Sequence, residues 1–495
     1  LCERLFSYLI VEKKKMETES WVDNFLTPIS LGAEDAEMPK MQLYKDISEL
    51  RIQPDEGTGV GQANRKQFTF TNRNLDIIQN LHEAYIEYTC ELNTTAVDTY
   101  VTTHTDTNHK AAADAFDNVV TKVLPMSAFW VDGYTFELND TTVSTQNSGL
   151  AKSLNVLNHG VYSAETRQLD YVGMSREGTS PFAVQKEKIP LKKMKLKIPL
   201  KFIIPYLKQN KISWGVKTTL KLTKLPDTEI TDIFNPLPTG LTAADIRIYD
   251  IELVVPYVKL ENNKQLSLWN QMYSSVNNRY WLENDYFTSS PYDNTGTESN
   301  LIYRIATKGL NSRPRWLLLS AVDPNTANGP AFEPMGFVDK DAEAYEAAVG
   351  NSLKLTKLRV KINGIYIDGG DVLEFQNVAT TDGDHDKMPF ATYGGDYPLA
   401  YDNYCKFFGL YDSKRTSPQS FRQWLTSQVY CFDLVNIDAE NIFANSGNAL
   451  IIEVEFSYVA GSNVANSQFK LVANVLYDKQ LSITHANNSA VLTLT

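Results

Sequence analysis

The sequence predicts an all-β protein built from two eight-stranded sandwiches in tandem. Three runs, Lys195–Ile204, Ser213–Leu225 and Asp245–Leu260, alternate apolar and polar residues, as half-buried strands do. Tyr (26 residues) and Phe (22 residues) are abundant in the 495-residue chain, and aromatic residues favour strands. The order of strands, a helix within a loop, and strands again occurs twice, each time over roughly 200 residues, a length that fits one sandwich with its loops.

Four segments are predicted along the chain. Residues 1–60 are predicted to form an N-terminal arm, because the part from residue 16 onward is acidic and ends in the linker-like PDEGTGVGQ. Residues 61–262 are predicted to form the first sandwich and 301–495 the second. Between them, residues 263–300 are predicted to be an inter-domain connection, because an apolar helical stripe is followed there by a polar bend rich in Asn, Ser and Thr.

The first fifteen residues, LCERLFSYLIVEKKK, are predicted to be a non-native leader or an arm outside the core. Met16 opens METESWVDNFLTP, which is typical of a natural start. The apolar part of the leader, Leu5–Val11, is too short to span a bilayer. The alternative is an amphipathic helix that touches a membrane surface.

Two short helices are predicted within loops. Leu150, Leu154, Leu157 and Val161 recur at helical spacing in the first half, and residues Ala400–Leu410 are predicted to be helical in the second half. Each helix is flanked by strand-like runs. The two halves therefore share an architecture, although no sequence identity between them is visible.

The composition limits the classes of function. The formal net charge is 47 − 59 = −12, which argues against a protein that mainly binds nucleic acid through Lys and Arg. No apolar run approaches the ~20 residues of a membrane-spanning helix. The four cysteines have no spacing typical of a zinc site. The sequence predicts a water-facing, mostly β protein with no membrane span and no cofactor.

One acidic segment is a weak candidate for a metal site. Asp382, Asp384 and Asp386 alternate in a predicted loop, and such carboxylates can converge on a hard cation. The EF-hand pattern fails, because Lys387 and Tyr393 stand where a glycine and a bidentate acid are needed. A solvated loop without metal is therefore favoured, and calcium at a subunit contact is the alternative.

A series of lysines gives the strongest local positive charge. The candidates for contact with DNA phosphates are Lys192, Lys193, Lys195 and Lys197. The structural interpretation is favoured: Lys195, Lys197 and Lys201 alternate with apolar residues, which predicts that they lie on the solvent face of a strand.

The sequence predicts no catalytic residues. The six histidines are scattered, and neither HExxH nor GxSxG occurs. Paired carboxylates of the glycosidase kind have no regular spacing, so a carbohydrate-binding or carbohydrate-cleaving β-sandwich protein is kept as an alternative. Its sugar platforms would come from four tryptophans, each in an apolar or helical run typical of buried residues: Trp269, Trp281, Trp316 and Trp424.

Several motifs occur in an order that resembles a known family. In the first half these are IPLKFIIPYL, WGVKTTLKLTKL and IELVVPYVKL. In the second half they are SRPRWLLLSAVDP, LTKLRVKINGIYID, YPLAYDNYCKFFGLYDS, ALIIEVEFSYV and FKLVANVLYDKQLSI. Together they resemble the double jelly-roll major capsid proteins of the Polinton, adintovirus and virophage group, over roughly residues 60–490.

The resemblance implies two tandem jelly rolls with short helices in loops, and a viral structural protein without enzymatic activity. It implies a homotrimer of pseudo-hexagonal, hexon-like outline that tiles an icosahedral shell around double-stranded DNA. The implied partners are other copies of the chain, a single jelly-roll penton protein at the vertices and, indirectly, the packaged DNA. The implied location is the virion, after synthesis in the host cytoplasm and assembly in the nucleus or a viral factory. A vertex or spike protein is disfavoured, because one jelly roll needs about half this length.

In a capsid subunit, long loops and the arm are the candidates for contacts between subunits. The loops are residues 323–350 and 378–396. Aromatic residues dominate the energies of many interfaces, so the possible interface residues are Trp21, Phe332, Phe337, Phe390 and Tyr393.

Overall fold

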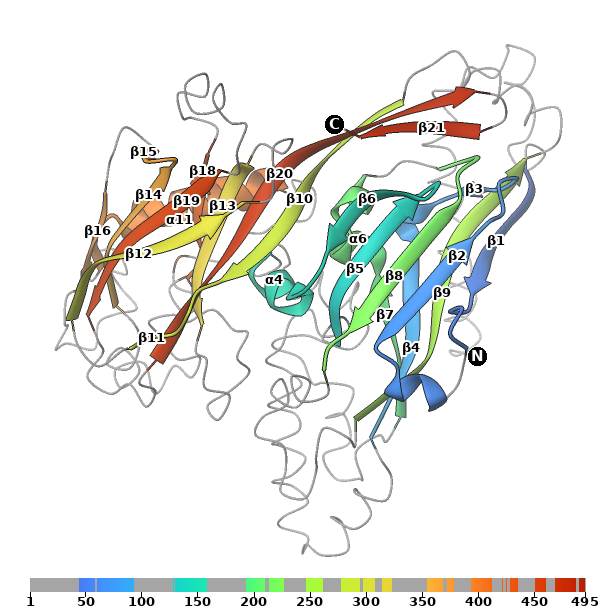
Figure 1. The fold of residues 1–495 in the computed structure, drawn as a ribbon, viewed down its shortest axis with the longest axis horizontal. Coiled ribbons are helices and arrows are strands. Elements are labelled where there is room, and N and C mark those ends of the chain that lie inside the picture. Colours follow the sequence, from blue (N-terminus) through green and yellow to red (C-terminus); the bar gives the residue numbers. More distant parts are fainter. Residues whose placement is uncertain are drawn as a thin grey trace, which may run out of the picture.

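The computed structural model describes most of two β-sandwiches. The described residues are 44–57, 60–92, 128, 130–157, 193–209, 213–226, 246–260, 277–293, 297–307, 314–322, 354–367, 372–377, 393–411, 421, 424, 428–434, 450–459, 468–486 and 489–494. The sandwiches lie side by side, and a long ribbon from the second extends over the first (Figure 1).

Two antiparallel sheets form the first sandwich. In spatial order, one sheet holds β1 (Tyr44–Ile52), β9 (Ile246–Leu260), β4 (Tyr85–Leu92) and β7 (Lys193–Pro199), with β3 (Ile78–Gln79) also pairing with β9. The other holds β2 (Gln67–Asn72), β8 (Thr218–Lys224), β5 (Val131–Leu138) and β6 (Thr141–Gln146). Short helices join these strands, among them η3 (Val60–Asn64), η4 (Leu81–Glu83) and α4 (Leu150–Leu157).

The second sandwich is built in the same way. One sheet holds β10 (Asn277–Thr288), β20 (Gln468–Ala486), β13 (Pro314–Val322) and β18 (Tyr430–Asp433), with β11 (Tyr292–Asp293) and β21 (Ser489–Leu494) also pairing with β20. The other holds β12 (Thr297–Ala306), β19 (Ile451–Val459), β14 (Lys354–Ile362), β16 (Leu373–Asn377) and β17 (Tyr393–Gly395), with β15 (Ile365–Tyr366) pairing with β14. Helix α11 (Tyr397–Tyr411) precedes β18.

Both sandwiches have the same strand order. When the eight main strands of each half are numbered along the chain, one sheet reads 1-8-3-6 and the other 2-7-4-5 in both halves. This order brings the first and last strands of each sandwich side by side, as in a jelly roll with Greek-key connections. The prediction of two tandem eight-stranded sandwiches is confirmed.

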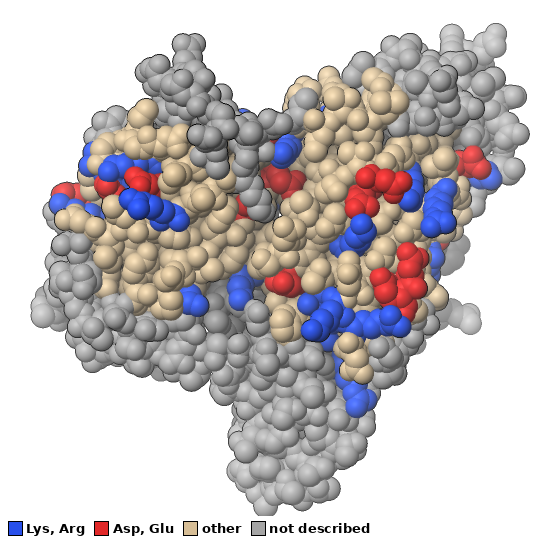
Figure 2. Space-filling model, in the orientation of Figure 1, with Lys and Arg blue, Asp and Glu red and all other residues tan. Residues whose placement is uncertain are grey.

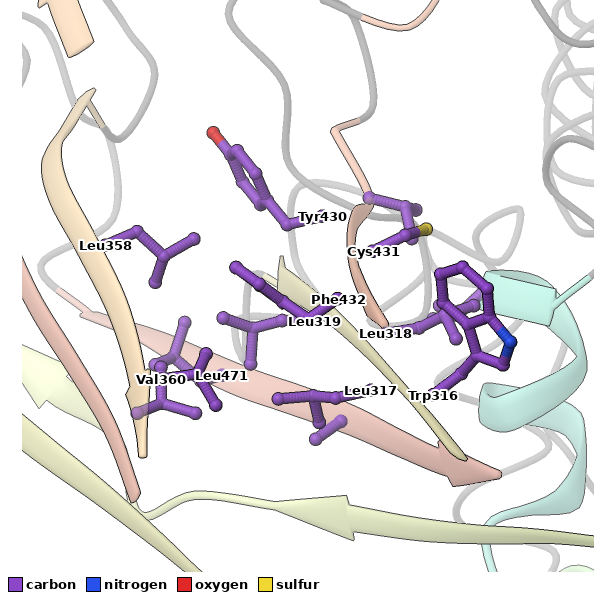
Figure 3. Close-up of a cluster of buried hydrophobic side chains, with 14 of the residues drawn as sticks. Trp316, Leu317, Leu318, Leu319, Leu358, Val360, Tyr430, Cys431, Phe432 and Leu471 are labelled. Carbon is purple, nitrogen blue, oxygen red and sulfur yellow. The ribbon is translucent and has the colours of Figure 1, made fainter. Parts of the chain in front are cut away.

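Alternation in the sequence explains the strands. In β2, Phe68 and Phe70 face the core while the residues between them are more exposed, because successive side chains of a strand point to opposite faces. In the second sandwich, Leu317 and Leu319 of β13 are buried with Phe432 of β18 and Leu471 of β20 (Figure 3). Burial of such side chains supplies about 1.5–3 kcal/mol each and is the main driving force for the sandwich.

The strand predicted over Lys195–Ile204 ends early. Strand β7 stops at Pro199, and Leu200–Ile203 form the one-turn helix α6, which η6 (Pro205–Lys208) follows. Pro199 and Pro205 lack the N–H that a strand pairing needs, and proline is well tolerated at the start of a helix. The apolar residues of α6 are buried in the core although they are not on a strand.

Other boundaries also differ from the sequence prediction. Strand β1 lies within the predicted arm, and β10 and β11 lie within the predicted connection. Both helices predicted in loops are present, as α4 and α11, although Val161 lies outside the described residues. Among the described residues, no helix is long and apolar enough to cross a membrane.

Candidate functional site at the junction of the two sandwiches

Helix α4 contributes to both hydrophobic cores. Leu150, Ala151 and Leu154 belong to the core of the first sandwich, whereas Val156 and Leu157 belong to the core of the second. The helix lies between the two halves (Figure 1). An eight-residue helix is marginal by itself in water, so packing on both sides stabilises it.

The ribbon of β10 and β20 extends from the second sandwich to the first. The two strands pair without interruption from Asn277↔Ile483 to Thr288↔Val472. On β20, Leu471 and Val475 belong to the second core, whereas Leu481 and Ile483, further along the same strand, belong to the first. The C-terminal strands therefore complete the core of the N-terminal half.

A buried carboxylate marks the point where β10 meets the first sandwich. Oε1 of Glu283 accepts hydrogen bonds from the Ser144 hydroxyl (2.9 Å), the Thr145 backbone N–H (3.2 Å) and the Tyr134 hydroxyl (3.4 Å). Oε2 accepts from Nε1 of Trp281 at 2.7 Å. Burial raises the pKa of Glu283 to about 7, although these hydrogen bonds lower it.

A buried cation lies four residues earlier on the same face of β10. Nη1 of Arg279 donates to the hydroxyl of Tyr206 at 2.7 Å and to the hydroxyl of Ser213 at 3.3 Å. The ring of Tyr206 also meets Trp281 edge to face, at 5.1 Å between centroids. Because buried polar groups need partners, these contacts fix how β10 lies on η6.

The outer face of the sheet β10-β20-β13-β18 is also buried. Its side chains on β13 and β20 include Trp316, Leu318 and Leu476, which are at most 5% exposed. Trp316 points toward helix α4 (Figure 3). On the same face, the Asn474 amide donates to the Ser153 backbone oxygen of α4 at 3.5 Å.

Hydrogen bonds hold the charged groups of the junction. Glu283 accepts from Ser144 of β6, and Arg279 donates to Tyr206 of η6. Within the described ranges, no three His, Cys, Asp or Glu side chains converge as metal ligands do. These contacts join β10 to the first sandwich.

Most of the predicted metal and interface residues lie outside the part of the chain that the structure describes. Asp382, Asp384 and Asp386 lie outside the described residues, and so do Trp21, Phe332, Phe337 and Phe390. Tyr393 begins strand β17, opposite Asn377 of β16. These assignments stay predictions.

The lysines predicted to contact DNA have different surroundings in the structure. Lys192 lies outside the described residues, and Lys193 is the first residue of β7. Nζ of Lys195 lies 3.7 Å from Glu87, and Nζ of Lys197 lies 4.3 Å from the ring centre of Tyr85. On the viewed face of the molecule, blue and red side chains are interspersed among uncharged ones, without a continuous basic field (Figure 2).

Lys201 is a correction to the sequence prediction. It was expected on the solvent face of a strand, yet it lies in α6 and is only 8% exposed. Its Nζ is 3.3 Å from Glu83. Strand β7 ends at Pro199, so the two-residue alternation of a strand does not apply to Lys201 and does not predict whether its side chain faces solvent.

Sequence reasoning missed the residues of the junction. Glu283 and Arg279 were placed in the predicted connection, because RYWLENDYF follows an apolar helical stripe within a segment rich in Asn, Ser and Thr. The signal was the alternation itself: Arg279, Trp281 and Glu283 share one parity and one face. Charged residues on a buried face make such a strand look like a loop.

Gly149 offers a test of the junction. Its φ is +70°, and a Cβ there would lie 2.5 Å from the ring of Tyr286 on β10. We expect Gly149→Ala to lower the free energy of unfolding by about 2–4 kcal/mol. The loss has two causes: alanine is strained at a positive φ, and its Cβ would crowd the ring of Tyr286. Gly364 has a φ of +81° with no atom within 4 Å of a built Cβ, so Gly364→Ala is the control for strain alone. Equal losses in chemical denaturation would contradict the close packing at Gly149.

Similarity between this chain and known proteins is found by comparison of structures and not of sequences. No protein-family model matches the sequence, and no curated protein matches it. The crystal structure of PBCV-1 VP54, fitted into a cryo-EM reconstruction of the virophage Sputnik, has a TM-score of 0.52 and 9% identity; the match covers 90% of this chain and 96% of that chain. A quasi-atomic model of the PBCV-1 virus capsid has a TM-score of 0.50 and 10% identity, covering 90% and 96%.

The strand order and these similarities define the class. The protein consists of two jelly rolls joined through a buried junction. Its fold is that of the double jelly-roll capsid proteins, the group to which the order of sequence motifs pointed.

Proposed function

We propose that this protein is a major capsid protein whose work is to enclose a genome. The observation that carries the proposal is the double jelly-roll fold, which extends over 90% of the chain and 96% of PBCV-1 VP54. The junction supports it. Buried hydrogen bonds at the junction join the two sandwiches of one chain, which suits a subunit of a shell.

The proposed capsomer is a homotrimer of pseudo-hexagonal outline. Two sandwiches with one strand order give three subunits six similar building units. Closed threefold symmetry makes a discrete particle rather than a fibre. Such capsomers would tile an icosahedral shell around double-stranded DNA, with a separate single jelly-roll protein at the vertices. The aromatic residues of the arm and loops, Trp21, Phe332, Phe337, Phe390 and Tyr393, are proposed to take part in subunit contacts.

The carbohydrate alternative gains no support from the tryptophans. Trp281, Trp316 and Trp424 are 7%, 5% and 0% exposed, so none of the three offers an open face for a sugar ring. Trp269 lies outside the described residues. Trp281 is instead a junction residue and Trp424 a core residue.

The solution mass of the purified protein tests the proposal. We expect light scattering to give about three times the 55.8 kDa of one chain, and negative-stain images of that peak to have hexagon-like outlines. A protein that stays monomeric at every concentration, and that binds glycans in an array, would contradict the capsid function.

A further inference from the structure

Three buried polar side chains meet between helix α4 and the ribbon of β10 and β20. Asn284 of β10, Asn474 of β20 and Ser153 of α4 are 2%, 0% and 0% exposed. Nδ2 of Asn284 donates a hydrogen bond to Oγ of Ser153 at 2.7 Å, and Nδ2 of Asn474 donates to the backbone oxygen of Ser153 at 3.5 Å. We call these three residues the amide cluster.

The pairing of the two strands places both amides on one face of the sheet. Asn284 lies opposite Leu476 and Asn474 lies opposite Tyr286, so the two asparagines are diagonal neighbours on adjacent strands. Diagonal neighbours on one face are close enough for their side chains to interact. Both amide nitrogens also bind the same serine, which holds the two amide groups next to each other under α4.

The two amide oxygens of the cluster have no donor from the protein. Among the described residues, none donates a hydrogen bond to Oδ1 of Asn284 or to Oδ1 of Asn474. Bulk solvent does not reach these buried atoms, and the neighbouring side chains of Leu318 and Leu476 are 0% exposed. An unpaired buried acceptor is costly, and nearly all such groups in folded proteins have a partner, either a protein group or an ordered water.

Turning an amide over does not remove the imbalance. With Asn474 turned, its oxygen would face the backbone oxygen of Ser153, and two acceptors cannot form a hydrogen bond. With Asn284 turned, the Ser153 hydroxyl could donate to its oxygen, but the NH2 group would then need an acceptor. In both orientations of Asn284, the cluster needs a further hydrogen-bonding partner.

Water matches the chemistry of the amide cluster. A water molecule has two O–H donors for the two oxygens, and its lone pairs can accept from the Ser153 hydroxyl or from a turned amide. A buried water typically makes about three hydrogen bonds to groups that would otherwise be unpaired. A divalent metal ion fits less well. Such ions take about six oxygen ligands, usually with carboxylates among them, whereas the cluster supplies neutral groups and Asp285 points to the other face of β10.

We infer that an ordered water molecule is part of the junction and donates one hydrogen bond to Oδ1 of Asn284 and one to Oδ1 of Asn474. The site joins α4 of the first sandwich to both strands of the ribbon from the second. A bridging water is nearly as favourable as a direct hydrogen bond, and it adapts to two surfaces that meet only when separate parts of the chain dock. The inference does not depend on the proposed capsid function.

A crystal structure of the full chain, at a resolution that shows ordered water, tests the inference directly. We expect an electron-density peak about 2.5–3.0 Å from both amide oxygens. Amide oxygens that accept hydrogen bonds from protein groups instead would overturn the inference. A crystal soaked in rubidium chloride distinguishes water from a monovalent cation, because an anomalous peak at the site would show an ion and would also overturn it.

Oxygen-17 magnetic relaxation dispersion counts long-lived water molecules in solution and needs no crystal. We expect Asn474→Leu to lose about one such water relative to wild type, because leucine has a similar volume and offers no acceptor. The matched control is Ser320→Ala. Ser320 is 1% exposed on the same face of the sheet, but its Oγ donates to the backbone oxygen of Ala321 at 3.3 Å, so the control should keep the wild-type count.

The two measurements keep the inference open to contradiction. A folded Asn474→Leu protein with an unchanged water count would overturn it, and circular dichroism checks the folding. Equal losses in Asn474→Leu and Ser320→Ala would also contradict it, because the lost water would not belong to the amide cluster. If Asn474→Leu does not fold, the crystal structure of the wild-type chain decides.

Discussion

Replacing Trp281 with alanine is expected to lower the free energy of unfolding by about 3–5 kcal/mol. The side chain packs edge to face on Tyr206 and belongs to the core of the first sandwich, although β10 is a strand of the second. Its removal leaves a cavity at the junction and also removes the Nε1 donor from the buried carboxylate of Glu283. Equilibrium denaturation measures the loss, and hydrogen exchange at β10 and η6 locates it.

Two further variants serve as controls for the expected loss of stability in Trp281→Ala. Tyr280 is the next residue on the same strand but is 62% exposed, so Tyr280→Ala should change the free energy of unfolding by no more than about 0.5 kcal/mol. Trp281→Phe keeps a smaller ring in the junction and removes the Nε1 donor, so its effect should fall between those of the two alanine variants, at about 1–3 kcal/mol. A loss for Trp281→Ala as small as that for Tyr280→Ala would mean that the junction does not hold the halves together.

Glu283 is expected to make the stability of the protein decrease as the pH rises from about 4.5 to about 7. Its pKa is raised from 4.5 to about 7 by burial, with a further contribution from the nearby carboxylate of Asp285. The folded protein therefore keeps a neutral carboxyl group in a range where the unfolded chain ionises it. Stability from this group is fully present below the unfolded pKa and is lost as the pH rises through the folded pKa, a change of about 3 kcal/mol.

Glu283→Gln removes this titration. Its free energy of unfolding relative to wild type should improve by about 3 kcal/mol between pH 4 and pH 8. Glu87→Gln is the control of opposite sign. Burial raises the pKa of Glu87, but hydrogen bonding and charge from Arg51 outweigh burial and hold it below its usual value. That variant should lose stability relative to wild type as the pH rises. A Glu283→Gln difference that does not vary with pH would show that folding leaves the pKa of Glu283 unchanged.

Much of the fold could be predicted from alternation in the sequence. Asp245–Leu260 and Ser213–Leu225 contain β9 and β8, and the helical spacing from Leu150 and the run Ala400–Leu410 located α4 and α11. These elements have one face in a core and one toward solvent, so their periodicity records the fold directly.

The junction could not be predicted in the same way. Pairing of β10 with β20 joins residues 184 to 206 positions apart, and a local pattern does not specify such a partner. Charges on a buried strand face, as at Arg279 and Glu283, obscure the alternation that identifies strands elsewhere. Strand β1 was missed for a related reason: Glu49 and Arg51 gave YKDISELRI the composition of a linker, whereas they lie on the outer face of a sheet.

The ribbon of β10 and β20 has a consequence for synthesis of the chain. Leu481 and Ile483 belong to the core of the N-terminal sandwich, yet the ribosome adds them roughly 220 residues after Leu260, where β9 ends. Domains usually fold one by one as they emerge, with the N-terminal domain first. Here the first sandwich stays incomplete until β20 has been synthesised, so a nascent chain cut short before β20 lacks part of its N-terminal core. Only chains that include β20 can then form a complete first sandwich.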